Sequence, residues 1–217
     1  MALLLSSFFF FCSCFLFNGS LAQIKIPAKF DGFAYKDVDL KMEKSIMVEA
    51  FFDPLCPDSR DAWHPLKQAL DHYSQVYLTV HPFPLPYHNN AFAACQLLHI
   101  ANKMNASSTY PLLDLFFKFQ DNYYNGPTYN MSKSSIINNM ANLAVTTIGK
   151  DKLPEVLSAF KDDDINTATR ISFKYGCSRG VTGTPFFFVN GFALQDSGAT
   201  LNYTDWRNII DPLVEKQ

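Results

Sequence analysis

Residues 51–59 read Phe51-Phe52-Asp53-Pro54-Leu55-Cys56-Pro57-Asp58-Ser59 and place a cysteine just after an apolar run. The run, residues 46–52, predicts a buried strand because it is short, apolar and bounded by a turn. Apolar residues at helical spacing follow and predict a helix over residues 58–72, with Pro57 in its first turn. Cys56 therefore lies where a strand meets a helix, and the N–H groups and dipole of a helix N-terminus can stabilise a thiolate there.

The motif lacks a second sulfur. Cysteines at both ends of residues 56–59 would form C-x-x-C, which makes and breaks its own disulfide. Ser59 occupies the second position, so no disulfide can close within the motif. Asp58 brings a negative charge close to the helix N-terminus and should disfavour a thiolate on Cys56. If Cys56 forms a mixed disulfide, a thiol from glutathione or from the substrate itself must resolve it.

The N-terminus predicts a secretory signal peptide, residues 1–22. Residues 2–17 carry no charge, and Ser20 and Ala22 place small side chains before a cleavage point at Gln23. A membrane span needs about 20 apolar residues, so an uncleaved anchor is the weaker alternative. No other stretch is long and apolar enough to span a bilayer. We expect the mature chain to enter the secretory pathway, to reside in the endoplasmic reticulum lumen or outside the cell, and to have no membrane partner.

The composition fits one domain over residues 23–217. Hydrophobic residues make up 48% of the sequence, which is enough for a sizeable core without disulfides. The formal charge of −2 offers no basic surface, so nucleic acid is not an expected partner. Three glycosylation sequons predict exposed positions that could carry glycans; they begin at Asn105, Asn130 and Asn202.

The mature chain holds three cysteines, Cys56, Cys95 and Cys177. An odd number in an oxidising compartment leaves at least one thiol free. If Cys95 and Cys177 form a disulfide, Cys56 is the free thiol. If they do not, both are expected to be small buried hydrophobic residues. The sequence does not choose between these alternatives.

We expect no metal site. Asp162-Asp163-Asp164 fits a loop and helix cap better than a calcium loop, which alternates its oxygen ligands and contains a glycine. Cys95 and His99 would share a helix face with His88 nearby, but a structural zinc site needs a fourth ligand, so core packing is the better interpretation. His81 and His88 flank a proline-rich loop, where one of them could line a groove, although a packing role is favoured.

The hydrophobic pattern predicts a β-α-β unit, a block of helices and a β-β-α unit. The strands at residues 46–52 and 76–80 should form a parallel pair, and the helix between them should make a right-handed crossover. The expected strands are residues 33–35, 46–52, 76–80 and 186–189, the last ending in the turn Asn190-Gly191. The expected helices are residues 58–72, 91–103, 110–124, 133–148, 153–160, 164–178 and 203–214.

This order resembles the thioredoxin superfamily, specifically its DsbA-like branch, which inserts a helical block between the halves of the fold. Three stretches carry the resemblance: residues 51–59, Phe83-Pro84-Leu85-Pro86-Tyr87-His88, and Gly180-Val181-Thr182-Gly183-Thr184-Pro185-Phe186-Phe187-Phe188-Val189-Asn190-Gly191. The chain is also similar to secreted plant thioredoxin-like proteins. The resemblance implies an α/β, thioredoxin-like fold, with a central mixed sheet flanked by helices and a helical insertion at about residues 88–162.

The resemblance also implies roles for individual residues. The family's nucleophile corresponds to Cys56, whereas its resolving cysteine corresponds to Ser59, whose hydroxyl could instead donate a hydrogen bond to the sulfur. Pro185 is expected to lie beside Cys56 and to follow a cis peptide bond. X–Pro bonds are the only peptide bonds whose cis form costs little free energy. The residue before it, Thr184, should present its backbone to a bound peptide. Pro57 and Asp58 would modulate the thiol.

One expected feature of the branch is displaced. DsbA-like enzymes usually place an acid six residues before the nucleophile, and that position is Ala50 in this sequence. Glu49 is one residue earlier, and neighbouring strand residues point to opposite faces, so Glu49 should face away from the site. Proton transfer by Glu49 is therefore not expected.

Two functions fit the sequence. A monothiol oxidoreductase would exchange thiols and disulfides with proteins or peptides through mixed disulfides on Cys56, as an isomerase, a glutathione-dependent reductase or a trap for thiol clients. It needs no bound cofactor, but glutathione could be its co-substrate. The alternative is a redox-inactive module that binds peptide or a client protein in the same groove. A glutathione-binding isomerase of the kappa-transferase type is less favoured, because such enzymes usually lack a signal peptide. The sequence indicates no oligomeric state.

Overall fold

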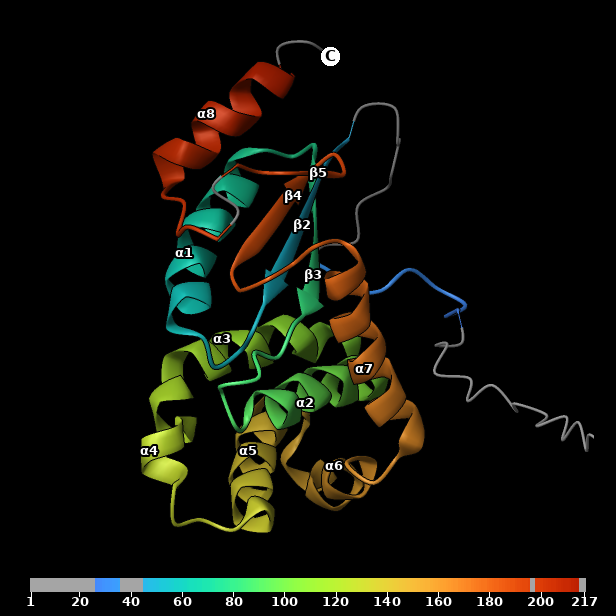
Figure 1. The fold of residues 1–217 in the computed structure, drawn as a ribbon. Coiled ribbons are helices and arrows are strands. Elements are labelled where there is room, and N and C mark those ends of the chain that lie inside the picture. The colour runs from blue at the N-terminus through green and yellow to red at the C-terminus, as the bar shows by residue number, and fades with distance from the viewer. Residues whose placement is uncertain (1–25, 36–44, 196–197, 215–217) are drawn as a thin grey trace, which may run out of the picture.

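The computed structural model describes residues 26–35, 45–195 and 198–214. Within these residues a five-stranded sheet runs through one half of the molecule in the order β1-β3-β2-β4-β5 (Figure 1). Only β2 and β3 are parallel; the other neighbouring strands are antiparallel. The strands are β1 Phe33–Ala34, β2 Ile46–Phe52, β3 Val76–Pro82, β4 Phe186–Val189 and β5 Phe192–Ala193.

Helices cover both faces of the sheet. Helices α1 (Pro57–His72) and α8 (Tyr203–Val214) lie together on one face, and α7 (Asp163–Ser178) lies on the other (Figure 1). Alternate residues of β2 point to these two layers. The Phe52 ring packs against Trp63 of α1, with centroids 5.8 Å apart, and the Phe51 ring stacks against Tyr175 of α7 at 6.0 Å. Because both faces are covered, six of the seven β2 residues are buried.

A block of helices stands between β3 and α7 and packs below the sheet in Figure 1. Its central helix is α2, whose Cys95, Leu97 and Ile100 have no exposed surface. The helices are α2 Ala91–Met104, α3 Thr109–Phe119, α4 Asn125–Thr128, α5 Lys133–Ile148 and α6 Leu153–Ala159. None of the described helices is long and apolar enough to cross a membrane.

Most expected elements are present, and two differ. The single helix expected over residues 110–124 is wrong: α3 ends at Phe119, and Gln120–Tyr123 form a 3₁₀ turn. This break places Gln120 against the loop that carries Cys56, so tertiary hydrogen bonds override the local helical period. Strand β3 also continues to Pro82, because β2 pairs with it as far as Phe52.

Two further expectations concern the ends and the surface of the chain. The signal peptide expected at residues 1–22 lies outside the described residues. The sequon residues Asn105, Asn130 and Asn202 are all exposed, as a surface position requires. Glycosylation at these three positions remains a prediction.

Candidate active site

Cys56 is the N-cap residue of α1, with extended backbone angles of φ −88° and ψ 123°. Its side chain is only 4% exposed. The thiol donates a hydrogen bond from Sγ to the carbonyl of Thr184, in the segment before β4, at 3.3 Å. The Thr184–Pro185 peptide bond is cis, as expected from the sequence. The fold thus brings the two motifs together, although 128 residues separate Cys56 from Thr184.

An apolar cluster surrounds the sulfur. Cys56 belongs to a group of buried side chains from β2, β4 and the segments that follow β3 and α7: Phe51, Phe83, Leu85, Val181 and Phe188. Gly176 of α7 makes this packing feasible, because a Cβ at that position would lie 2.5 Å from an atom of the Phe83 ring. The thiol therefore lies among apolar side chains, and its hydrogen bond goes to the Thr184 backbone.

Ser59 does not play the role expected for its hydroxyl. The residue is fully buried in the first turn of α1, and its Oγ has no hydrogen-bond partner among the described residues. The expected hydrogen bond to the Cys56 sulfur is therefore not formed in this structure, where the thiol hydrogen is directed to Thr184. A buried hydroxyl without a partner costs about 1–3 kcal/mol, so Ser59 contributes no stability to the site.

Asp53 and Gln120 hold the Cys56 turn from two sides. The fully buried Asp53 accepts the backbone N–H of Leu55 at 2.8 Å and that of Leu85 at 3.0 Å. Gln120, also fully buried, donates from Nε2 to the carbonyls of Pro54 and Cys56, at 3.2 and 3.3 Å. These contacts tie the Cys56 turn to the helical insertion. Neither Asp53 nor Gln120 was predicted from the sequence to belong to the site.

His88 lies on the helical-domain side of the same turn. Its Nδ1 is 2.8 Å from the Asp53 carboxylate. The imidazole lines a pocket of about 290 Å³ together with Leu55 and Pro57, the two neighbours of Cys56, and with residues 123–126. The expectation that one of the two loop histidines could line a groove therefore applies to His88.

A comparison of the sequence with protein-family models gives a match to the family described as Thioredoxin over residues 43–212. The chain belongs to the thioredoxin family. This match and the sheet with its inserted helices confirm the fold class expected from the sequence. Among curated proteins, none matches the chain.

Solved structures share this thioredoxin fold with its helical insertion. A protein from Pseudomonas syringae, provisionally described as a protein-disulfide isomerase, has a TM-score of 0.68 at 16% identity, over 83% of this chain and 98% of that chain. The thiol-disulfide exchange protein alpha-DsbA2 of Wolbachia pipientis has a TM-score of 0.62 at 15% identity, with coverages of 86% and 87%. DsbA2 of Pseudomonas aeruginosa has a TM-score of 0.60 at 18% identity, with coverages of 88% and 97%. At these identities the likeness is one of fold.

Two further cysteines, Cys95 and Cys177, lie in the described part of this thioredoxin-family chain. Cys95 and Cys177 are both free, so the disulfide that the sequence allowed between them is not formed. Cys95 is fully buried on α2, and burial raises the pKa of its thiol well above the ordinary value. Cys177 lies on the exposed side of α7, which also makes the expectation of a buried residue wrong at this position.

Glu49 lies on the α7 face of the thioredoxin sheet in a buried polar network. Both of its carboxylate oxygens accept hydrogen bonds from the Arg179 guanidinium at 3.2 Å, and Tyr175 donates a third at 3.0 Å. Burial opposes ionisation of Glu49, but hydrogen bonds from His81, Arg179 and Tyr175 and the Arg179 charge outweigh it and lower the pKa to about 2. None of these partners is Cys56. Glu49 therefore stays ionised as part of this buried network, and it does not accept a proton from the Cys56 thiol.

The network continues to the segment before β1. His81 lies between two acids, with Nδ1 2.8 Å from Asp31 and Nε2 3.5 Å from Glu49. Burial lowers the pKa of His81, but hydrogen bonds to the two carboxylates and their charges outweigh it, so the pKa of His81 is raised overall.

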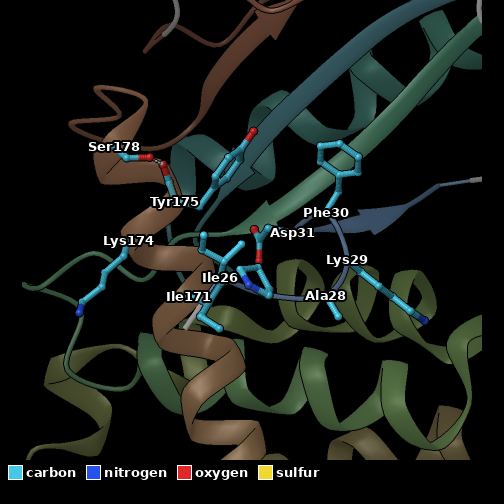
Figure 2. Close-up of a pocket in the computed structure, with 10 residues that line it drawn as sticks. Ile26, Ala28, Lys29, Phe30, Asp31, Ile171, Lys174, Tyr175 and Ser178 are labelled. Atoms are coloured by element: carbon cyan, nitrogen blue, oxygen red, sulfur yellow. Dashed lines mark hydrogen bonds between the residues drawn. The ribbon is translucent and has the colours of Figure 1, made fainter. Parts of the chain in front are cut away.

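Figure 2 shows Asp31 and Tyr175 at the walls of a pocket of about 600 Å³ between residues 26–31 and α7. In the described part of the chain, no cluster of three His, Cys, Asp or Glu side chains could hold a metal ion.

Asp58 offers a direct test of the electrostatics at the nucleophile. It is exposed in the first turn of α1, two residues after Cys56. Because its charge opposes a thiolate at the helix N-terminus, we expect Asp58→Asn to speed the reaction of Cys56 with a soluble aromatic disulfide about two- to fivefold at low salt. Stopped-flow absorbance in a Cys177→Ser background measures this rate. Asp163→Asn, in the first turn of α7, is the control, and equal rates for both variants would contradict the expectation.

Proposed function

We propose that this protein exchanges thiols and disulfides with protein or peptide clients through mixed disulfides on Cys56. The observation that carries the proposal is the position of Sγ, at the N-terminus of α1 and 3.3 Å from the Thr184 carbonyl beside a cis proline. A client backbone that pairs with Thr184 would bring a disulfide to the sulfur. The helix N-terminus would stabilise the attacking thiolate.

The chemistry is an exchange with no net redox change in the protein. The Cys56 thiolate attacks one sulfur of a client disulfide, the client S–S bond breaks, and the other client sulfur leaves as a thiolate. Ser59 cannot release the resulting mixed disulfide, so a second client thiol or glutathione must do so. The first route rearranges client disulfides, and the second reduces them. Self-sufficient dithiol oxidation is the activity that this site lacks.

The proposed compartment is the secretory pathway, in the endoplasmic reticulum lumen or outside the cell. The N-terminal segment with signal-peptide character supports this compartment. Proteins with disulfides, which are the proposed clients, occur mainly in oxidising compartments. Exposed sequons at Asn105, Asn130 and Asn202 are compatible with glycosylation there.

The second candidate function is a redox-inactive module that binds peptide in the same groove. The low exposure of Cys56, at 4%, favours it, because a nucleophile must be reached by its substrate. The groove beside Thr184 would then serve for binding only.

One experiment separates the two functions. The mature protein and its Cys56→Ala variant, both carrying Cys177→Ser, are incubated with a scrambled-disulfide protein and a glutathione redox buffer. The proposed function predicts that recovery of native disulfides is accelerated by the parent and falls to the uncatalysed rate with Cys56→Ala. Equal client binding by both proteins, with no acceleration by either, would support the binding module and contradict the exchange function.

A further inference from the structure

Asp53 orients His88 beside the nucleophile. Both oxygens of the buried Asp53 carboxylate already accept backbone N–H groups, from Leu55 and Leu85, so the carboxylate acts as an acceptor toward His88 as well. The Nδ1 atom of His88, 2.8 Å away, must then carry the hydrogen. A neutral imidazole held in this way presents its unprotonated nitrogen, Nε2, on the opposite edge of the ring.

The loop that carries His88 runs beside Cys56. Leu85 packs in the same apolar cluster as Cys56. Burial and the charges of Cys56, Asp53 and Asp58 raise the pKa of the Tyr87 phenol. Asn125 of α4 fixes the loop by donating to the Tyr87 carbonyl at 2.8 Å and accepting from the Asn89 N–H at 2.9 Å.

The pocket that His88 lines has the size and position for a small co-substrate. Its volume of about 290 Å³ lies near the lower end of the range for small-molecule sites. Leu55 and Pro57, the chain neighbours of Cys56, line the pocket on the side of the α1 turn. Tyr123, Tyr124 and residues 125–126 form the other wall. The helical insertion therefore lines a pocket next to the turn that carries Cys56.

We propose that this pocket binds the low-molecular-weight thiol that releases a client from Cys56, and that His88 accepts the proton of that thiol. This inference rests on the proposed exchange function. The need arises from Ser59, because the releasing thiol must come from another molecule. A thiol with an ordinary pKa of about 8.5 is only about 1% ionised at pH 6.5, and the thiolate is the attacking species.

The release step balances in atoms and electrons. Cys56 is joined to the client sulfur by an S–S bond, and the small thiol passes its proton to Nε2 of His88. The new thiolate attacks the client sulfur, a disulfide between client and small thiol forms, and the bond to Cys56 breaks. Cys56 leaves as a thiolate and is protonated by the His88 imidazolium or by water. The mixed disulfide is the oxidant, so no further reagent is needed.

The other ionisable groups around His88 are two carboxylates, the Cys56 thiol and three tyrosines. Asp53 contacts Nδ1, and Asp58 and Cys56 lie on the neighbouring α1 turn. The tyrosines are Tyr87, Tyr123 and Tyr124; burial raises the pKa of all three, to about 12 for Tyr124. These phenols therefore stay neutral between pH 6 and 9.

The test uses His88→Asn, because the asparagine amide can keep the hydrogen bond to Asp53 while Nε2 is lost. The mixed disulfide between Cys56 and glutathione is prepared in the Cys177→Ser background, and its release by reduced glutathione is followed by mass spectrometry. At pH 6.5 we expect release to slow by about 10- to 100-fold, the upper bound set by the ionised fraction of the thiol. At about pH 9.5, where the thiol is ionised already, the rates should agree within about twofold. His64→Asn, an exposed histidine on α1, is the matched control.

The outcomes separate this inference from the proposed function. A parent protein that forms no mixed disulfide on Cys56 overturns both. A parent that forms and releases the mixed disulfide, with His88→Asn equal to it at every pH or slower by one constant factor, overturns the role of His88 alone. If His88→Asn slows release only when a cysteine-containing peptide replaces glutathione, the assignment of the pocket to a small thiol is overturned.

Discussion

Replacing Ser59 with cysteine is expected to turn this protein into a dithiol oxidase. Residue 59 lies in the first turn of α1, three residues after the N-cap Cys56, and three-residue spacing puts side chains on one helix face. The Ser59 hydroxyl is buried and has no hydrogen-bond partner in the described structure, so a cysteine loses no contact and suits the apolar surroundings better. An intramolecular thiol also has a far higher effective concentration than millimolar glutathione.

The expected result is a disulfide between residues 56 and 59 and release of a Cys56-bound client at least about tenfold faster than by glutathione alone. Alkylation and mass spectrometry of the oxidised variant identify the bond, and oxidation of a reduced client protein gives the activity. Ser59→Ala is the control, since it removes the same hydroxyl without adding a thiol. A Ser59→Cys variant whose two cysteines both stay alkylatable under oxidising conditions would contradict the proposed geometry.

Replacing Glu49 with alanine is expected to destabilise the folded protein strongly. Glu49 is buried on β2, and its removal leaves the Arg179 guanidinium without its carboxylate partner, whereas His81 keeps Asp31 on Nδ1. Breaking a buried ion pair by removing one partner costs about 3–5 kcal/mol. Chemical denaturation at pH 7 measures the difference in free energy of unfolding. Glu155→Ala, which breaks an exposed pair with Lys152, is the control and should change little.

The pH dependence of this effect has a definite sign. The pKa of Glu49 is lowered to about 2 in the folded protein, below its unfolded value, so the carboxylate contributes stability above about pH 4.5. That contribution should disappear as the pH falls from about 4.5 to about 2. The difference between parent and Glu49→Ala should therefore shrink over this range. A difference that stays constant down to pH 2 would show that the loss at pH 7 comes from packing and not from the charge.

The juxtaposition of Cys56 with the cis proline was expected from the resemblance to the DsbA-like branch. Each partner lies in a stretch that carries its own local signal: a strand-to-helix turn for Cys56 and a strand-opening proline for Pro185. The bounds of β2 also agree with the apolar run that predicts it. These features depend on short segments, and the fold then brings the segments together.

The residues that hold and flank the nucleophile were not predictable in the same way. Gln120 reaches Cys56 across 64 residues, and its surroundings continue a helical pattern that hides the break after Phe119. His88 contacts Asp53 because of the conformation of a loop that contains three prolines. Hydrophobic periodicity does not predict the conformation of such a loop. One signal was present: an aspartate before a turn often bonds backbone N–H groups nearby, as Asp53 does with Leu55.

The acid missing beneath the nucleophile gives the site its character. Ala50 stands at the position where DsbA-like enzymes usually carry that acid, and the neighbouring Glu49 is neutralised by Arg179 on the other face of β2. A proton that leaves or reaches the thiols therefore does not pass through Glu49. We propose that His88, which Asp53 orients in the pocket lined by Leu55 and Pro57, takes that role.

The identity of the cysteine that forms a mixed disulfide decides whether Cys56 is the nucleophile. The mature protein is incubated with oxidised glutathione, quenched with acid, and mapped by peptide mass spectrometry, with Cys177→Ser and Cys56→Ala measured in parallel. We expect one adduct on Cys56 in the Cys177→Ser variant, its release by reduced glutathione, and no adduct on the buried Cys95. Labelling confined to Cys177, with Cys56 unmodified under conditions that keep the protein folded, would contradict the exchange function.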